Sequence, residues 1–190
     1  MRWITAAVLC AFLVSCSSLK LIEQDTPDGQ ERFTVKRGSI RHGTYTIWYP
    51  NGAKKMEVEY RNGKKNGLET LWDAFGAKLR ETTYVNGNKS GKEIFWNHRG
   101  VLEKEILYRA DKQEGLETTF YSNGKKAKEE LYKNGLKDGL EIGYDESGRK
   151  IYEAFYRAGK KHGKEIFYDY SAGEQPRVTT INWENGEVVK

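Results

Sequence analysis

The chain repeats one 24-residue unit six times, and this period constrains the fold more than any other feature of the sequence. The template starts at a glycine and has an aromatic residue at position five, a second glycine at nine, an aromatic residue at seventeen and a turn glycine at twenty. So short and regular a period predicts a repeat architecture in which each copy packs against its neighbours. The first glycines are Gly43, Gly67, Gly91, Gly115, Gly139 and Gly163.

Each copy is predicted to form two strands joined by turns. β-Branched residues at position three and aromatic residues at position five give a period of two, which is typical of a strand. In the second copy we expect strands over 67–72 and 78–85. Asn-Gly occurs seven times, and both residues tolerate the positive φ of a tight hairpin turn. The residues at positions three and five are Thr46/Trp48, Thr70/Trp72, Ile94/Trp96, Thr118/Phe120, Ile142/Tyr144 and Ile166/Tyr168.

The two faces of the predicted sheet are expected to differ. One face should carry positions three and five together with the aromatic residues at position seventeen, as a ladder across neighbouring strands. The opposite face should carry glutamates at positions two and fourteen, with apolar residues at positions four and sixteen. The glutamates are Glu69, Glu93, Glu117, Glu141 and Glu165, and Glu57, Glu81, Glu105, Glu129 and Glu153; the apolar residues are Ile47, Leu71, Phe95 and Phe167, and Leu107, Leu131 and Phe155.

The predicted fold class is all-β: an elongated antiparallel β-meander, or array of β-hairpin repeats, over residues 42–190. With strands about 4.8 Å apart, six copies would extend over about 58 Å. Residues 32–41 resemble a degenerate second strand and are expected to cap the N-terminal end, while the last copy, with an insertion around 171–176, caps the other. Copy three has Ala110-Asp111 instead of Asn-Gly, so we expect its turn to be displaced.

Residues 1–15 have the features of an export signal peptide. Arg2 precedes an apolar run from Trp3 to Leu13, which is shorter than the roughly 20 residues that a membrane-spanning helix needs. The segment that follows, Leu13-Val14-Ser15-Cys16, resembles the lipobox of bacterial lipoproteins. This resemblance implies cleavage before Cys16, attachment of a diacylglyceryl group to its thiol, and anchoring in a membrane. The alternative is an incidental cysteine after a buried N-terminal segment.

The residues after the lipobox bear on location. Ser17 stands where an Asp, by resemblance to enterobacterial lipoproteins, would favour retention at the inner membrane, so the outer membrane or the cell surface is expected. Residues 16–31 are predicted to be the lipidated cysteine and a flexible tether, because the polar stretch that ends at Glu31 contains turn formers and no apolar period.

Composition argues against several kinds of site. Loss of residues 1–15 removes Arg2 and leaves 31 basic and 27 acidic residues, a net charge of +4 with neutral histidines. The basic residues alternate with glutamates, so we expect no nucleic-acid partner. Cys10 and Cys16 are the only cysteines, which excludes a thiol nucleophile or a zinc–cysteine site in the repeats.

Metal binding and catalysis are not expected either. His42 and His162 occupy one template position five copies apart, which is too far for a shared metal, and His98 is predicted to be a surface residue in a turn. The glutamates recur in nearly every copy, which favours a structural role over the paired acids of a glycosidase. No phosphate-binding glycine motif is present. We therefore predict no catalytic residue, metal or cofactor, and a protein that is not an enzyme.

The motif Gly-x-Glu-x-x-aromatic-x-x-x-Gly, followed by Glu-x-x-Tyr-x-x-Gly, resembles the variant form of the membrane occupation and recognition nexus (MORN) repeat over residues 42–190. The resemblance implies a hairpin-repeat fold. The family is functionally mixed, and its bacterial members include envelope lipoproteins and proteins labelled antitoxin-like or immunity-like.

The expected function is a non-enzymatic envelope lipoprotein whose repeat sheet binds another protein, either an envelope protein or a toxin. An antitoxin or immunity role, and recognition of lipid headgroups or glycans, are the alternatives. The tryptophans either pack as core or line a groove, and exposed apolar residues indicate a partner surface. The candidate binding residues are Trp48, Trp72, Trp96, Phe95, Phe155 and Phe167.

Overall fold

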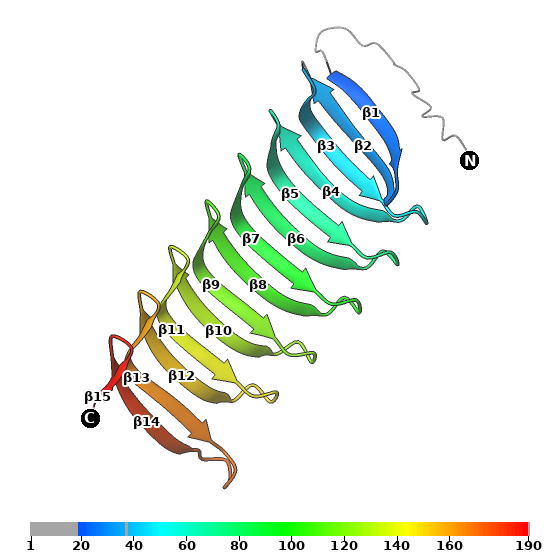
Figure 1. Ribbon diagram of the computed structural model, residues 1–190. Helices are drawn as coiled ribbons and strands as arrows, with labels where there is room; N and C mark the ends of the chain where they lie inside the picture. The colour runs from blue at the N-terminus through cyan, green and yellow to red at the C-terminus, as the bar shows by residue number, and fades with distance from the viewer. Residues whose placement is uncertain (1–18, 37, 190) are drawn as a thin grey trace. The chain divides into compact units, whose positions relative to one another are not determined.

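The computed structural model describes residues 19–36 and 38–189, and Figure 1 shows these residues as successive β-hairpins. Two compact units divide the chain: residues up to 89 with 98–100, and residues 90–97 with 101 onward. The strands are β1 (Leu19–Thr26), β2 (Gly29–Lys36), β3 (Ile40–Trp48), β4 (Lys54–Arg61), β5 (Lys64–Trp72), β6 (Lys78–Val85), β7 (Asn88–Trp96), β8 (Leu102–Arg109), β9 (Lys112–Phe120), β10 (Lys126–Lys133), β11 (Leu136–Tyr144), β12 (Lys150–Arg157), β13 (Lys160–Asp169), β14 (Arg177–Glu184) and β15 (Glu187–Val189). Within the described ranges no helix is long and apolar enough to cross a membrane.

Within each unit, strands that are consecutive in the chain pair in antiparallel register. This holds from β1 to β6 in the first unit and from β7 to β15 in the second. The predicted second strand of copy two, 78–85, is β6. The all-β antiparallel meander of hairpin repeats that the sequence predicts is therefore confirmed.

Two-residue turns join the second strand of one copy to the first strand of the next. Asn62 and Gly63 have φ values of 53° and 79°. A type I′ turn requires a positive φ at both of its central residues. The displaced turn predicted for copy three is wrong, because Ala110 (φ 48°) and Asp111 (φ 66°) form the turn at the same template position. The paired strands on both sides fix the turn, and their hydrogen bonds outweigh the strain of two non-glycine residues.

Relief of this strain gives a first prediction. Ala110→Asn should raise the free energy of unfolding by about 0.5–1 kcal/mol, because Asn tolerates positive φ better than Ala does. The reciprocal change, Asn86→Ala, places Ala at a matched position with φ 52° and should lower it by a similar amount. Urea unfolding followed by tryptophan fluorescence measures both. A loss of stability in Ala110→Asn would contradict the prediction.

The first glycine of each copy lies inside a strand rather than at its start. β5 begins at Lys64, so the strand start predicted at Gly67 is three residues too late. Pairing with β4 passes from Val58–Glu69 to Tyr60–Lys65, so three residues of β5 stand opposite Glu59. Gly67 has φ +133°, and a Cβ there would lie 3.1 Å from the Cβ of Glu59. The glycine therefore allows a β-bulge.

The distribution of side chains over the two faces also differs from the prediction. Gly67 pairs with Tyr84 and Glu69 with Thr82, so template positions that add up to seventeen lie opposite each other. Since seventeen is odd, even positions of the first strand share a face with odd positions of the second strand. Each face therefore carries one row of glutamates and one row of aromatic residues.

These two faces are named here by their aromatic rows. The tyrosine face carries the position-two glutamates and the position-seventeen aromatics: in the last copy Trp183 Nε1 donates to Glu165 Oε2 at 2.8 Å. The tryptophan face carries positions three, five and fourteen: in copy four and its neighbour the Tyr144 hydroxyl donates to Glu129 Oε2 at 2.7 Å. The prediction that both glutamate rows share one face is wrong for this reason of register.

Few of the described side chains are fully buried in either unit, and some of those that are buried carry a charge. Val58 is 0 % exposed, but Glu69 and Glu93 are each only 1 % exposed. The buried apolar residues in the part of the chain that the structure describes are Val35, Tyr45, Val58, Ile106 and Ala154. A single sheet with so little apolar burial depends on hydrogen bonds and ion pairs to satisfy its buried polar groups.

The N-terminal region forms a further hairpin, so the flexible tether predicted for 16–31 is wrong over its described part. β1 pairs with β2 from Leu19–Lys36 to Thr26–Gly29. β1 is almost entirely exposed, and an exposed strand needs no apolar period, which is why its composition indicated a tether. The predicted cap strand 32–41 is divided: its first part lies in β2, whereas Ile40 and Arg41 begin β3. The export signal and Cys16 lie outside the described residues.

Candidate functional site

The six predicted binding residues do not form one surface. Trp48, Trp72, Trp96 and Phe155 lie on the tryptophan face of their hairpins, whereas Phe95 and Phe167 lie on the tyrosine face, as their strand pairing requires. In the first unit the Arg32 guanidinium lies 5.5 Å from the ring centre of Trp48, and Lys54 Nζ lies 5.2 Å from that of Trp72. These cations cover part of the rings, and all three tryptophans are half-buried.

The tyrosine face holds buried carboxylates that are surrounded by donors. Glu165, 3 % exposed, accepts hydrogen bonds from Tyr152 and Trp183, each at 2.8 Å, and forms an ion pair with Lys161. Burial alone would raise the pKa of Glu165, but the hydrogen bonds from Lys161, Tyr152 and Trp183 outweigh it and lower the pKa. Burial and the bond to Glu165 raise the pKa of Tyr152 well above its usual value.

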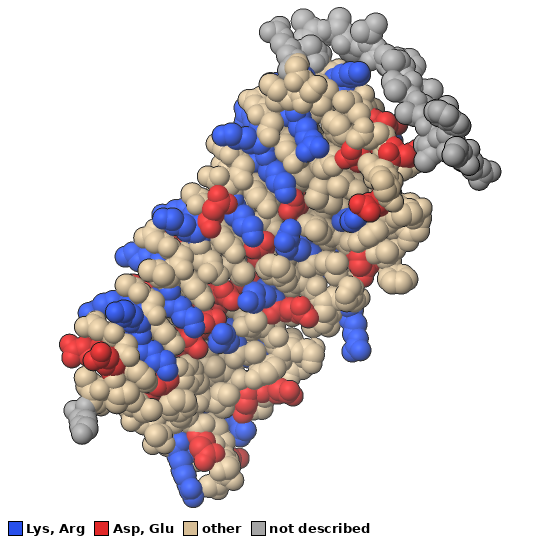
Figure 2. All heavy atoms as spheres, viewed as in Figure 1, with Lys and Arg blue, Asp and Glu red and all other residues tan. Residues whose placement is uncertain are grey.

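A second carboxylate cluster lies on the same face of β10 and β11. Glu130, 3 % exposed, forms ion pairs with Lys128 at 2.8 Å and with Lys137, and Lys137 also reaches Glu141 at 2.6 Å. Burial opposes ionisation of Glu130, but its bonds to Lys128 and Lys137 prevail and lower its pKa. On the face that Figure 2 shows, Lys and Arg (blue) are interspersed with Asp and Glu (red).

These environments determine what the glutamates can do chemically. Glu129, Glu130 and Glu165 all have lowered pKa values, so they are ionised at neutral pH. A general acid of the glycosidase type needs a raised pKa. The three carboxylates instead neutralise lysines and hold tyrosines, which is a structural use of charge.

Two of the histidines, His42 and His98, have local structural contacts, whereas the buried Nδ1 of His162 has no hydrogen-bond partner among the described residues. His42 Nδ1 accepts the backbone N–H of Asn62 at 3.4 Å, next to the turn of the following hairpin. Asn66 and Asp138, at the same template position, accept from Asn86 (3.1 Å) and Ala158 (3.0 Å). This turn-capping role was not recognised from the sequence, although the run of acceptors at one position signals it. No group of metal-ligating side chains occurs among the described residues.

The surface residue His98 makes a specific contact. Its Nδ1 lies 3.0 Å from Asp73 Oδ2 in the loop of the preceding copy. This contact, with backbone bonds from Ala77 and Phe75, lowers the pKa of the Asp73 carboxyl. Phe75, in the same loop, is 97 % exposed and was not selected from the sequence.

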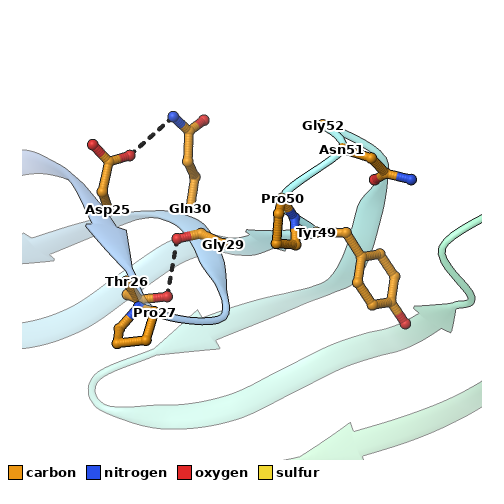
Figure 3. Close-up of a pocket in the computed structure, with 9 residues that line it drawn as sticks. All are labelled: Asp25, Thr26, Pro27, Gly29, Gln30, Tyr49, Pro50, Asn51 and Gly52. Atoms are coloured by element: carbon orange, nitrogen blue, oxygen red, sulfur yellow. Dashed lines mark hydrogen bonds between the residues drawn. The ribbon is translucent and has the colours of Figure 1, made fainter.

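A shallow open hollow of about 550 Å³ lies in the first unit, between the β1–β2 turn and the loop after β3 (Figure 3). Asp25 accepts from Gln30 at 3.0 Å, and the Thr26 hydroxyl donates to the carbonyl of Gly29 at 3.0 Å. Its side-chain polar groups are thus partly occupied by each other. The lining residues are Asp25, Thr26, Pro27, Gly29, Gln30, Tyr49, Pro50, Asn51 and Gly52.

The tryptophan face of the second unit carries a row of exposed apolar side chains that was not predicted from the sequence. We call it the leucine stripe: Leu116, Leu131, Leu140 and Phe155, which are 39 %, 41 %, 51 % and 37 % exposed. Leu131 and Phe155 were placed by sequence on a glutamate face, but Leu116 and Leu140 belong to position one, which the template did not include. Strand pairing brings the four together.

Comparison with known families supports the repeat assignment. The model described as MORN repeat variant matches residues 41–62 and 113–134. Both segments cover the same template positions of copies one and four, and each contains one hairpin, β3–β4 and β9–β10 respectively. No curated protein sequence matches the chain significantly. The chain therefore carries MORN-type repeats at these two places, and each of them is folded as a β-hairpin of an antiparallel meander.

Proposed function

We propose that the chain is a non-enzymatic scaffold whose hairpin repeats bind another protein at the cell envelope. The observation that carries this proposal is the leucine stripe, since exposed contiguous apolar side chains on a soluble surface mark interaction sites. The buried glutamates support it, because their carboxylates are bound to side chains within the sheet. Binding of a partner therefore falls to the exposed residues. The proposed partner is an envelope protein or a toxin.

Anchoring through Cys16 is the second part of the proposal. Each buried CH₂ of a lipid chain contributes about 0.8 kcal/mol, so the two or three chains of a mature lipoprotein would hold the domain firmly. The MORN-type repeats, the lipobox and the preceding apolar run are all compatible with an exported domain. The β1–β2 hairpin then stands close to the anchored residue in sequence.

Replacement of the lipidated residue tests the anchor. Cys16→Ser should leave the precursor without lipid and move the protein out of the membrane fraction, because no thiol remains at the lipobox position to be acylated. Cys10→Ser, inside the signal segment, is the matched control and should still partition into detergent. Detergent-phase partitioning and intact mass measure both variants. Normal partitioning of Cys16→Ser would refute the anchor.

Crosslinking in cells tests the scaffold. Lysine crosslinking of the full chain, with Cys16→Ser as the comparison, should capture one stoichiometric envelope protein or toxin through lysines of adjacent copies. Capture of a toxin favours the antitoxin role. No protein above background would overturn the scaffold and favour lipid or glycan recognition.

A further inference from the structure

The leucine stripe is continuous across four strands of the second unit. Leu116 pairs with Leu131 between β9 and β10, and Leu140 pairs with Phe155 between β11 and β12. The side chain of Leu131 extends over Gly139 of β11, next to Leu140: a Cβ on Gly139 would lie 2.6 Å from Leu131 Cδ2. The apolar surface therefore runs across the strands, at right angles to them.

A row of cations borders the stripe on the side of the tight turns. Arg109 pairs with Lys112, and Arg157 with Lys160, at the ends of β8–β9 and β12–β13. Lys133 lies between these pairs, opposite Leu136. By strand alternation these residues lie on the tryptophan face. Lys133 and Arg157 are two positions from Leu131 and Phe155, and Lys112 is four positions from Leu116. We call them the basic row.

The basic row carries more cations than carboxylates. Its five cations form no ion pair with any residue that the structure describes, and all are exposed. Three carboxylates, Asp111, Glu114 and Asp138, lie in or next to the same turns, and those of Glu114 and Asp138 accept the backbone N–H groups of Asn134 and Ala158. The other side of the stripe is different, because Glu129 and Glu153 are paired with Lys126 and Lys150. Only the side of the stripe that faces the tight turns therefore has an excess of positive charge to attract a negatively charged partner.

We propose that the leucine stripe and the basic row together bind an acidic amphipathic helix of a partner protein, with its apolar side on the stripe and its carboxylates on the basic row. The inference rests on the proposed scaffold function and specifies the chemistry of the partner. Helices with one apolar side are commonly bound by apolar grooves and faces of this kind.

The spacing of the repeats fits a helix laid across the strands. Equivalent side chains of successive hairpins are about 9.6 Å apart, two strand spacings. Seven residues of an α-helix rise about 10.5 Å. Carboxylates at heptad spacing would therefore meet Arg109/Lys112, Lys133 and Arg157/Lys160 in turn, while leucines of the same helix follow the stripe.

Charge disfavours the other occupants. In a two-fold contact between two copies the same patch meets itself, which brings the unpaired cations of both into one interface. A flat anionic bilayer would face the whole patch, including the Glu129 and Glu153 side on which charges are already paired. A helix with one acidic edge matches the one-sided charge.

The test measures binding of a labelled synthetic peptide to the full chain by fluorescence anisotropy. The peptide is an amphipathic helix of about three heptads with leucines on one side and glutamates along one edge. It should bind more weakly as salt is added, since the basic row is exposed. A peptide with lysines in place of the glutamates should bind at least about tenfold more weakly.

Matched variants locate the binding. Leu140→Ser and the double variant Arg157→Glu/Lys160→Glu should each weaken binding about tenfold. The controls sit at the same template positions in the first unit: Leu68→Ser, where Leu68 pairs with Thr83, and Arg61→Glu/Lys64→Glu. Controls should bind like the unchanged chain, and all variants should keep its circular dichroism spectrum.

Each other result overturns the inference. Such results are no peptide binding, equal binding of the lysine peptide, or equal loss in the controls. Binding to vesicles of phosphatidylglycerol and phosphatidylcholine that Leu140→Ser abolishes, without peptide binding, would assign the stripe to a bilayer. Self-association abolished by Leu140→Ser would assign it to a second copy. If crosslinking captures a partner through the first unit while the peptide fails, the scaffold stands and this inference alone is wrong.

Discussion

Gly139→Ala is expected to lower the free energy of unfolding by about 3–4 kcal/mol. Gly139 has φ +127°, a conformation that costs other residues about 1–3 kcal/mol. The new Cβ would also lie 2.6 Å from Leu131 Cδ2 and 3.1 Å from Leu131 Cβ, so the Leu131 side chain must turn away from β11 and its Cβ must shift by a few tenths of an ångström. Overpacking of this kind costs about 1–3 kcal/mol.

Gly163→Ala is the matched control for that prediction. Gly163 occupies the same template position with φ +82°, but a Cβ there meets no atom within 4 Å. The expected loss is backbone strain alone, about 1–2 kcal/mol. Because hairpins of a repeat array unfold partly independently, hydrogen exchange of the β10 and β11 amides should detect the difference beside urea unfolding. Equal losses in the two variants would show that the contact with Leu131 is not responsible.

The strands could be predicted wherever turn chemistry marks both ends. The strand expected over 78–85 is β6 because Gly76 precedes it and Asn86-Gly87 follows it. Copy three shows that the turn survives without those residues, since the flanking ladder imposes positive φ on Ala110 and Asp111. The starts of the first strands were misjudged because a glycine inside a strand looks like a turn, whereas Gly67 permits a bulge.

The faces were harder to predict than the strands. Alternation assigns faces within one strand, but the relation between two strands depends on register, and Gly67 opposite Tyr84 could not be read from residue types. The same register assembles the leucine stripe from positions one and sixteen. A rule that paired template positions adding up to seventeen would have identified Leu116 with Leu131 and Leu140 with Phe155.

Glu165→Ala should be about as damaging as Gly139→Ala, with a loss of about 3 kcal/mol. Glu165 is 3 % exposed and is the acceptor for Tyr152, Lys161 and Trp183. Removal of one partner from a buried ionic cluster leaves the others unsatisfied, which costs more than the cluster contributes as a whole. Glu174→Ala, at an exposed position of the loop before β14, should change the free energy of unfolding by less than about 0.5 kcal/mol.

Acid should remove the difference between the unchanged chain and Glu165→Gln, which keeps the size of the side chain without its charge. The pKa of Glu165 is lower in the folded chain than its ordinary value, which is about 4.3 in unfolded peptides. Its stabilisation is therefore fully present above pH 4.3 and is lost as the pH falls through the folded pKa. The urea midpoints of the two proteins should differ clearly at pH 7, and the difference should shrink progressively as the pH is lowered below 4.3. Equal midpoints at pH 7 would mean that the shape of the side chain, rather than its ionised carboxylate, holds Lys161 and Trp183 in place.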